Sequence, residues 1–174
     1  MCRYSEYIVK HLRHCDFPPS NALCIYHCVS EPQIEIGEYV EQLIDKGTIM
    51  KDDLKDMILI YSLVLLNRCC QTEGFHVCKF SVHRVMLTLL LLSSKLCDDE
   101  AFYNVDWASF GGVSNKHLND LERNSALLLH YRLHVTKREL DSMQNELFPE
   151  KHSLLSLKVN ASTLKHQATI ISMV

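Results

Sequence analysis

Glu122 is the residue whose surroundings most strongly indicate a chemical role. On a helix it shares one face with mainly apolar neighbours, which are Leu118, Leu121, Ser125, Ala126 and Leu129. A carboxylate in such a face is costly to bury unless it has a partner. Lys95, at the polar end of a long apolar segment, is the candidate counterion. Two interpretations stay open: an ordinary surface ion pair, or a pair at the edge of a helical bundle with hydrogen-bonding capacity left for another molecule.

Histidine and cysteine residues gather near the N-terminus and raise the question of a zinc site. Two clusters lie close together in the sequence: His11, His14 and Cys15, and then Cys24, His27 and Cys28. A zinc site needs four ligands that converge tetrahedrally, and the common Cys-x2-Cys spacing does not occur in this sequence. We therefore expect no metal, and we expect these cysteines to be reduced and partly buried.

Motifs typical of enzymes are also missing from the sequence. Gly111-Gly112 lacks the lysine and the length of a phosphate-binding loop, and neither Gly-x-Ser-x-Gly nor His-Glu-x-x-His occurs. A Cys/His nucleophile stays open, because the two residues of such a pair meet only in space. By elimination, the sequence predicts a binding module without a cofactor rather than an enzyme.

Composition predicts a single all-α domain. The 174 residues are 47% hydrophobic and 22% charged, with five glycines and four prolines. So few turn formers argue against a sandwich, a barrel or a doubly wound sheet. A net charge of −3 without a block of like charge argues against a nucleic-acid partner. The longest apolar run, 85–92, is too short to span a membrane, and the first residues do not resemble a signal peptide. We expect an intracellular protein of the cytoplasm and/or nucleus with no membrane partner.

Apolar periodicity and helix-ending residues predict where the helices lie. We expect helices over about 3–15, 36–46, 52–70, 81–97, 102–110, 114–130 and 136–148, and a short one around 21–29. Gly47 and Gly111-Gly112 mark helix ends, Ser114 is an expected N-cap, and Thr136 with Glu139 matches a capping box. Apolar residues at helical spacing over 154–171 predict a last helix that packs back on the domain, with a partner-binding tail as the alternative.

The segment 81–97 is the most informative of these helices, because it is apolar nearly all the way round. Such a helix is expected to be the buried centre of a bundle. Its polar residues Arg84, Thr88 and Lys95 form one narrow stripe, which we expect to be the side that meets water or a partner.

A set of motifs in a fixed order resembles the cyclin box. It covers residues 34–140 and is most specific over 81–133, where Ser81-Val82-His83-Arg84 runs to Ser94-Lys95-Leu96-Cys97-Asp98-Asp99. The continuation resembles one branch, the phosphate-signalling (Pho-type) cyclins of fungi with their plant P- and U-type relatives. It consists of Phe102-Tyr103-Asn104-x-x-Trp107, Gly111-Gly112-Val113-Ser114, Leu118-Asn119-x-Leu121-Glu122 and Tyr131-Arg132-Leu133.

This resemblance implies an all-α fold built on a single five-helix cyclin box over 34–148. The box is flanked by an N-terminal helical extension over 1–33 and a C-terminal amphipathic helix or tail over 149–174. The implied function is a regulatory subunit that binds and activates a cyclin-dependent serine/threonine kinase and does no chemistry itself. The alternative is a cyclin-fold adaptor that binds other proteins without activating a kinase.

The resemblance also implies which residues bind the kinase. In cyclins, a lysine and a glutamate pair with each other and hydrogen-bond the backbone of the kinase loop that precedes its PSTAIRE-type helix. Lys95 and Glu122 match these positions. The positions that supply apolar contact to the same kinase helix are matched by Leu96, Ala126, Tyr131 and Leu133.

The sequence departs from the family pattern at two places. The family's Leu-Asp-Arg is Leu66-Asn67-Arg68 here, so a hydrogen bond from Asn67 would have to replace a salt bridge to the first helix of the box. Some members of the branch also engage the kinase activation region with an acidic residue after the fifth helix. The basic pair Lys137-Arg138 before Glu139 leaves that contact unassigned here.

Overall fold

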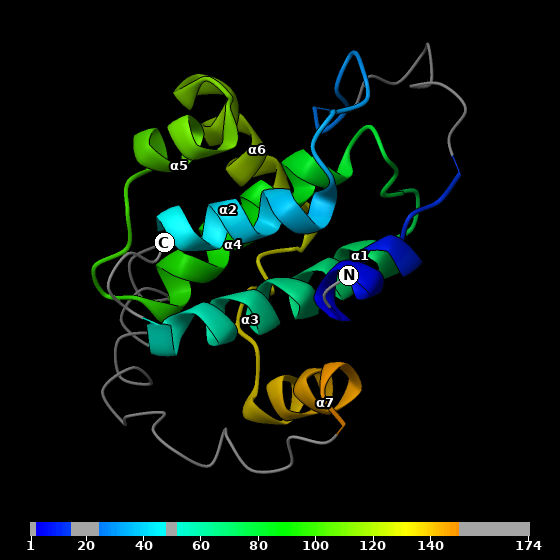
Figure 1. Ribbon diagram of the computed structural model, residues 1–174, viewed down its shortest axis with the longest axis vertical. Coiled ribbons are helices and arrows are strands. Elements are labelled where there is room, and N and C mark those ends of the chain that lie inside the picture. The colour runs from blue at the N-terminus through cyan, green and yellow to red at the C-terminus, as the bar shows by residue number, and fades with distance from the viewer. Residues whose placement is uncertain (1–2, 15–24, 48–51, 150–174) are drawn as a thin grey trace.

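A computed structural model describes residues 3–14, 25–47 and 52–149 of the chain, and these form seven helices and no strand (Figure 1). The predicted all-α class is therefore confirmed. From residue 150 on, the predicted C-terminal helix or tail lies outside the described residues. The helices are α1 (Arg3–Lys10), α2 (Ile36–Gly47), α3 (Asp52–Gln71), α4 (Val82–Cys97), α5 (Asn104–Gly111), α6 (Asn115–Leu128) and α7 (Lys137–Leu147).

Helix α4 is the centre of the bundle, as its apolar sequence predicts. It packs against α2, α3, α5 and α6, while α7 packs on α3, and α1 contacts both α2 and α7 (Figure 1). The leucines at 87 and 89–91 are fully buried. Each contributes about 1.5–3 kcal/mol of burial free energy relative to an exposed side chain. The leucine-rich composition therefore serves mainly the inner layer of the bundle.

The middle of the polar stripe on α4 does not face water, which corrects the sequence-based expectation for Thr88. Thr88 is completely buried, and its hydroxyl donates to the carbonyl of Arg84 at 2.7 Å. The Arg84 guanidinium donates in turn to the carbonyl of His27 at 2.6 Å, and to that of Ile25 at 3.4 Å. The segment 25–28 thus covers the middle of this side of α4, and Arg84 and Lys95 at the two ends of the stripe stay partly exposed.

Two helices predicted near the N-terminus are shorter than expected or are not formed. Helix α1 ends at Lys10 rather than near residue 15, and the chain then leaves the helix because the Arg13 amide donates to the carbonyl of Val77 at 2.8 Å. The predicted helix around 21–29 is not formed over 25–29. There the Cys28 amide donates to the carbonyl of Phe80 at 2.8 Å, so tertiary contacts replace the local helical bonds.

The predicted helix ends after α5 and before α6 and α7 are confirmed. Gly112 ends α5 with a φ of 68°, a left-handed conformation that favours glycine. The hydroxyl of Ser114 accepts from the His117 amide, so Ser114 is the N-cap of α6. Thr136 and Glu139 form the reciprocal capping box at the start of α7. These caps fix where the chain turns around the candidate site.

Gly47 ends α2 for a different reason from the one its position suggests. A Cβ atom at Gly47 would lie 2.5 Å from the indole of Trp107, which is completely buried. The absence of a side chain therefore lets α2 and α5 approach closely, and α5 also packs on α6.

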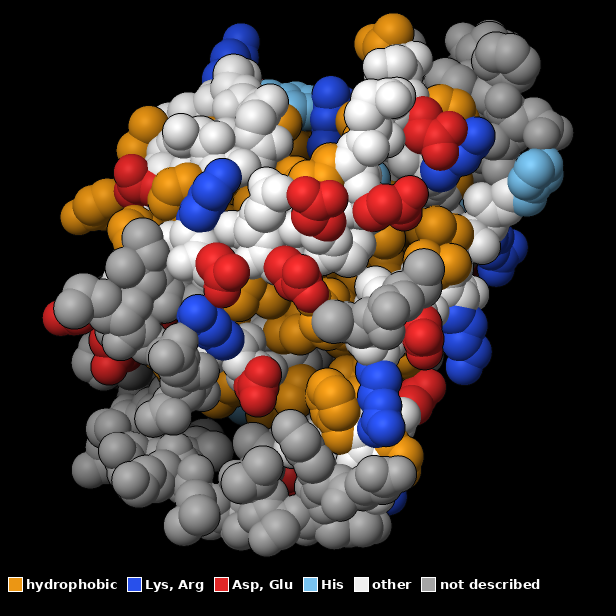
Figure 2. Space-filling view, viewed as in Figure 1, with side chains coloured by type: hydrophobic (Ala, Val, Ile, Leu, Met, Phe, Trp, Pro, Cys, Tyr) orange, Lys and Arg blue, Asp and Glu red, His pale blue; other side chains and the backbone are white. Residues whose placement is uncertain are grey.

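The surface over α2 is acidic, which the linear sequence does not make obvious. Its exposed residues include Glu38, Glu41 and Asp45, spaced by three and four positions. Figure 2 shows acidic side chains gathered across the middle of this face. Within the described ranges, none of the helices has the length and hydropathy that crossing a membrane requires.

Candidate functional site

Lys95 and Glu122 form the ion pair that the sequence predicts. The packing of α6 on α4 brings the Lys95 Nζ atom to 2.6 Å from the Oε1 atom of Glu122. Their side chains are 37% and 23% exposed, so the pair lies at the edge of the bundle and is open to another molecule. A lysine ammonium has three hydrogen-bond donors, and Glu122 uses one of them.

Asn104, the first residue of α5, holds the other oxygen of the same carboxylate. Its Nδ2 atom lies 2.6 Å from Glu122 Oε2 and 2.7 Å from the Oδ1 atom of Asn119. The sequence prediction missed this residue. Asn104 stands in the motif that resembles the cyclins, but the fold alone shows that residues 104 and 122 meet.

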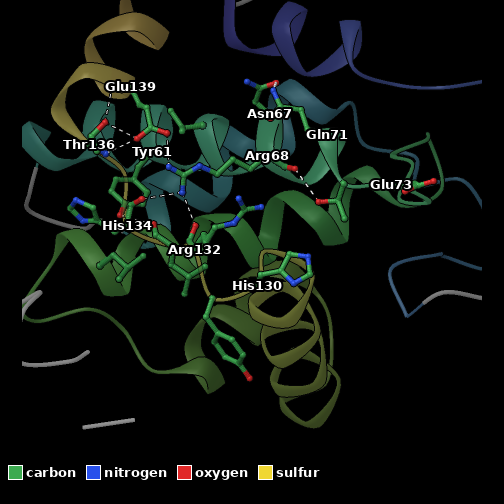
Figure 3. A pocket seen from close by; sticks show the side chains of 15 residues that line it. Tyr61, Asn67, Arg68, Gln71, Glu73, His130, Arg132, His134, Thr136 and Glu139 are labelled. Carbon is green, nitrogen blue, oxygen red and sulfur yellow. Dashed lines mark hydrogen bonds and ion pairs between the residues drawn. The ribbon is translucent and has the colours of Figure 1, made fainter. Parts of the chain in front are cut away.

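The four residues predicted to supply apolar contact differ in their surroundings. Leu96 and Leu133 are half-buried, and Tyr131 is 62% exposed. These three line a groove of about 1080 Å³ between α3 and the segment 130–136 (Figure 3). Ala126 is half-buried on α6, one helical turn after Glu122.

The end of α6 is a helix-ending motif made without glycine. The Tyr131 amide donates to the carbonyl of Ala126, and the His130 amide donates to that of Leu127, both at 2.8 Å. This is the Schellman pattern, which usually has glycine at the left-handed position. Here His130 and Tyr131 have φ values of 51° and 56°, a conformation that costs an ordinary residue about 1–2 kcal/mol. Backbone strain thus lies beside the groove, where Tyr131 projects into solvent.

A second ion pair lies in the same groove and connects three parts of the chain. Arg68 Nη2 lies 2.6 Å from Glu139 Oε1, and Arg68 Nη1 donates to the carbonyls of Arg132 and His134 at 2.6 and 3.0 Å. Figure 3 shows the Arg68 side chain reaching from α3 toward Glu139 and Thr136. Thr136 also donates to the Glu139 carboxylate through its amide and its hydroxyl.

These hydrogen bonds keep Glu139 ionised to a lower pH than usual. Burial opposes its ionisation, but hydrogen bonds from Arg68 and Thr136 outweigh burial and lower its pKa to about 2. The same segment is tied from inside by Tyr61, whose hydroxyl donates to the carbonyl of Leu133 at 2.9 Å and accepts from the Val135 amide at 3.0 Å. Burial raises the pKa of Tyr61 to about 12, so the hydroxyl stays protonated.

The two departures from the family pattern meet at this groove. The Oδ1 atom of Asn67 accepts from Gln71 at 3.4 Å within α3, instead of replacing the salt bridge to the first helix of the box. Arg68, the next residue, makes the long-range contacts of this helix end. Glu139, for which the sequence left a contact with the kinase activation region unassigned, is bonded to Arg68 and Thr136 inside the molecule.

The cysteines and histidines give no metal centre within the described part of the chain, where no three potential ligands converge. Cys15 and Cys24 of the two clusters lie outside the described residues, so the expectation of no zinc stays a prediction. Among the described residues, a Cys/His contact joins Cys78 Sγ to His27 Nε2 at 3.6 Å. Burial raises the pKa of the Cys69 and Cys97 thiols to about 12, which keeps these two thiols protonated and poorly nucleophilic.

Comparison with known proteins gives a consistent result. Residues 9–133 match the family model described as Cyclin. Cyclin-U2-1 of Arabidopsis thaliana is 26% identical over 119 residues, which are 68% of this chain and 51% of that protein. Cyclin-U3-1 of the same plant is 38% identical over 115 residues, 66% of this chain and 50% of that protein. Cyclin-P3-1 of Oryza sativa subsp. japonica is 27% identical over 111 residues, 64% of this chain and 45% of that protein. The chain spans about half the length of these relatives.

Proposed function

Since the chain belongs to the cyclin family, we propose that it is the regulatory subunit of a cyclin-dependent serine/threonine kinase. Cyclins regulate kinases and do not transfer phosphate themselves. In this proposal the chain binds the kinase beside its PSTAIRE-type helix and holds that helix in the active position. The observation that carries the proposal is the partly exposed ion pair between Lys95 and Glu122, with its oxygen and nitrogen 2.6 Å apart.

The geometry of the pair suits recognition of a backbone segment. The two remaining donors of the Lys95 ammonium are available for carbonyl groups, and the Glu122 carboxylate offers acceptors for amide hydrogens. Charge-assisted hydrogen bonds of this kind are about twice as strong as neutral ones. A kinase loop laid across the pair would therefore be held through its main chain, which does not require a particular kinase sequence.

The groove next to the pair suits the apolar side of a helix. Leu96 follows Lys95 directly, and Leu133 with Tyr131 lines the same groove. Exposed tyrosine at the centre of an interface commonly contributes a large share of the binding free energy. We place the kinase helix on this side, with Ala126 leaving room for its close approach.

Activation in this proposal is a population shift in the kinase. The cyclin binds the active arrangement of the kinase helix more tightly than the inactive one. Moving an equilibrium from about 1:99 to 99:1 requires a preference of about 5.5 kcal/mol for the favoured state. That preference would come from contacts to both the loop and the helix.

The proposal is tested with purified chain and a cyclin-dependent kinase from the same organism, through calorimetric affinity and phosphorylation of a peptide substrate. We expect Lys95→Ala and Glu122→Ala each to weaken binding by about 2–4 kcal/mol, because each leaves an uncompensated charge in the interface. Lys116→Ala, an exposed lysine at the other end of α6, is the matched control and should bind normally.

Two outcomes would contradict the proposal in different ways. Unchanged affinity of the folded Lys95 and Glu122 variants would reject the assignment of the binding site. Tight binding to the kinase without a rise in phosphorylation rate would instead favour the adaptor function, in which the fold binds a partner but does not activate it.

A further inference from the structure

We propose that Asn104 is a positioning residue of the kinase-binding site, and that it acts by fixing the carboxylate of Glu122. The inference rests on the proposed function, because it concerns the same pair. It assigns a role to a side chain that contacts Glu122 from α5, the third helix that meets at the site besides α4 and α6.

The hydrogen bonds of Asn104 determine the orientation of its side-chain amide. Its Nδ2 atom lies within 2.7 Å of two oxygens, Glu122 Oε2 and Asn119 Oδ1, and an amide nitrogen has two hydrogens to donate. Both hydrogens are used, and rotating the amide would place its carbonyl oxygen against two acceptors. The orientation of Asn104 is therefore determined by its neighbours.

The same bonds hold Glu122 at both oxygens. Lys95 bonds to Oε1 and Asn104 bonds to Oε2, each at 2.6 Å, so the plane of the carboxylate is fixed by two donors from two different helices. Without Asn104, the carboxylate would be attached at one oxygen and would pivot about the flexible Lys95 side chain. Ordering it again on binding would then cost conformational entropy.

The backbone around Asn104 is held in place by hydrogen bonds and by a buried side chain. The Tyr103 amide donates to the Asp106 carboxylate at 3.2 Å, the Asp106 amide donates back to the Tyr103 carbonyl at 3.0 Å, and Trp107 in the same turn is completely buried. The side chains on either side of Asn104 are nevertheless exposed, with Tyr103 at 79% and Val105 at 56%. Asn104 thus stands in an anchored turn whose outer surface is free for contact.

The experiment is a double-mutant cycle on kinase affinity with Asn104→Ala, Glu122→Ala and the variant that carries both. We expect Asn104→Ala to weaken binding about tenfold, the size of one charge-assisted hydrogen bond. In the Glu122→Ala background, Asn104→Ala should change kinase affinity by less than about twofold, because the carboxylate that Asn104 holds is absent. A full tenfold effect in that background would overturn the positioning role, as would unchanged affinity of Asn104→Ala alone.

Two further measurements separate this proposal from the proposed function. Asn124→Ala, an exposed asparagine elsewhere on α6 that bonds only within its helix, should leave affinity unchanged. A crystal structure of Asn104→Ala should show Glu122 in more than one side-chain conformation, and a single retained conformation would reject the inference without any kinase. If Glu122→Ala weakens binding but Asn104→Ala does not, only the role of Asn104 fails. If neither weakens binding, the assignment of the site fails as well.

Discussion

Two ion pairs of the molecule have the same length but differ in the hydrogen bonds that surround them. Lys95 with Glu122 and Arg68 with Glu139 each bring nitrogen to 2.6 Å from oxygen. The Arg68 pair is enclosed in a network, in which its guanidinium also binds two carbonyls and the carboxylate also accepts two hydrogen bonds from Thr136. The Lys95 pair has one additional donor, Asn104.

The difference teaches that a short distance does not identify a functional pair. Where several hydrogen bonds inside the molecule hold both partners, a pair stabilises the fold and offers less to a partner. Where donors remain on a partly exposed ammonium, the pair contributes little to stability and is able to recognise another molecule. The two pairs are about equally exposed, but the Arg68 pair joins α3 to the start of α7 through further hydrogen bonds, whereas the Lys95 ammonium keeps donors for another molecule.

The largest effect on stability is expected for Arg68→Ala. It removes the bonds to Glu139, Arg132 and His134 at once, so we expect the free energy of unfolding to fall by about 3 kcal/mol. Chemical denaturation measures this loss. Arg68→Lys should retain less than half of the stability that Arg68→Ala loses, because an ammonium group does not reproduce the planar arrangement of donors in a guanidinium. Arg123→Ala, which breaks an exposed pair of 3.6 Å with Asp120, is the control, and an equal loss there would contradict the comparison.

Glu139→Gln is expected to have the next largest effect, about 1 kcal/mol, because neutral hydrogen bonds replace charge-assisted ones. The folded-state pKa of Glu139 is about 2, below its ordinary value of 4.5. A carboxylate with a lowered pKa stabilises the fold fully above its unfolded-state value and loses that contribution as pH falls toward the folded-state value. The difference in free energy of unfolding between wild type and Glu139→Gln, measured by chemical denaturation, should thus stay constant from pH 7 to 5 and shrink below 4.5. A difference in free energy of unfolding that does not change with pH down to 2.5 would contradict the lowered pKa of Glu139.

His130→Gly is expected to stabilise the protein by about 0.5–1 kcal/mol. The left-handed conformation at φ 51° is unstrained for glycine, and this gain exceeds the entropy that glycine adds to the unfolded chain. Thermal unfolding compares the variant with His130→Ala, which keeps the strain and should bring no gain. Equal melting temperatures for the two variants would show that the strain beside the Arg68 network is negligible.

Lys95→Ala is expected to have the smallest effect on stability, below about 0.5 kcal/mol, in line with partly exposed ion pairs. Glu122 keeps the hydrogen bond from Asn104 in this variant. The same denaturation experiment as for Arg68→Ala provides the measurement. A loss comparable to that of Arg68→Ala would make the Lys95 pair a structural element and would remove the contrast between the two pairs.

Much of the fold follows from local sequence signals. The caps at Gly112, Ser114 and Thr136 depend on neighbouring residues, and each was predicted where the structure has it. The family resemblance was confirmed by the match over residues 9–133 and by the plant U- and P-type relatives. The pairing of Lys95 with Glu122 was also predicted, because a carboxylate on an apolar face requires a counterion.

The failures concern contacts between residues far apart in the chain. Periodicity predicts Thr88 in a water-facing stripe, because it does not reveal that residues 25–28 cover this side of α4. The helix predicted around 21–29 is replaced over its described part by a backbone bond to Phe80, more than fifty residues later. The contacts of Arg68 with Glu139, Arg132 and His134 are also distant in sequence and are not predicted. The capping box alone is enough to explain a glutamate at position 139.

The burial of α4 has a consequence for how a partner would be received. Helix α4 is enclosed by four other helices, and its amide hydrogens between Met86 and Leu92 should exchange with solvent only when the whole domain unfolds. Lys95 and Leu96 extend from the last turn of this slowly exchanging helix. The backbone at this site is already ordered before a partner binds. Association therefore costs conformational entropy of side chains but almost none of the main chain.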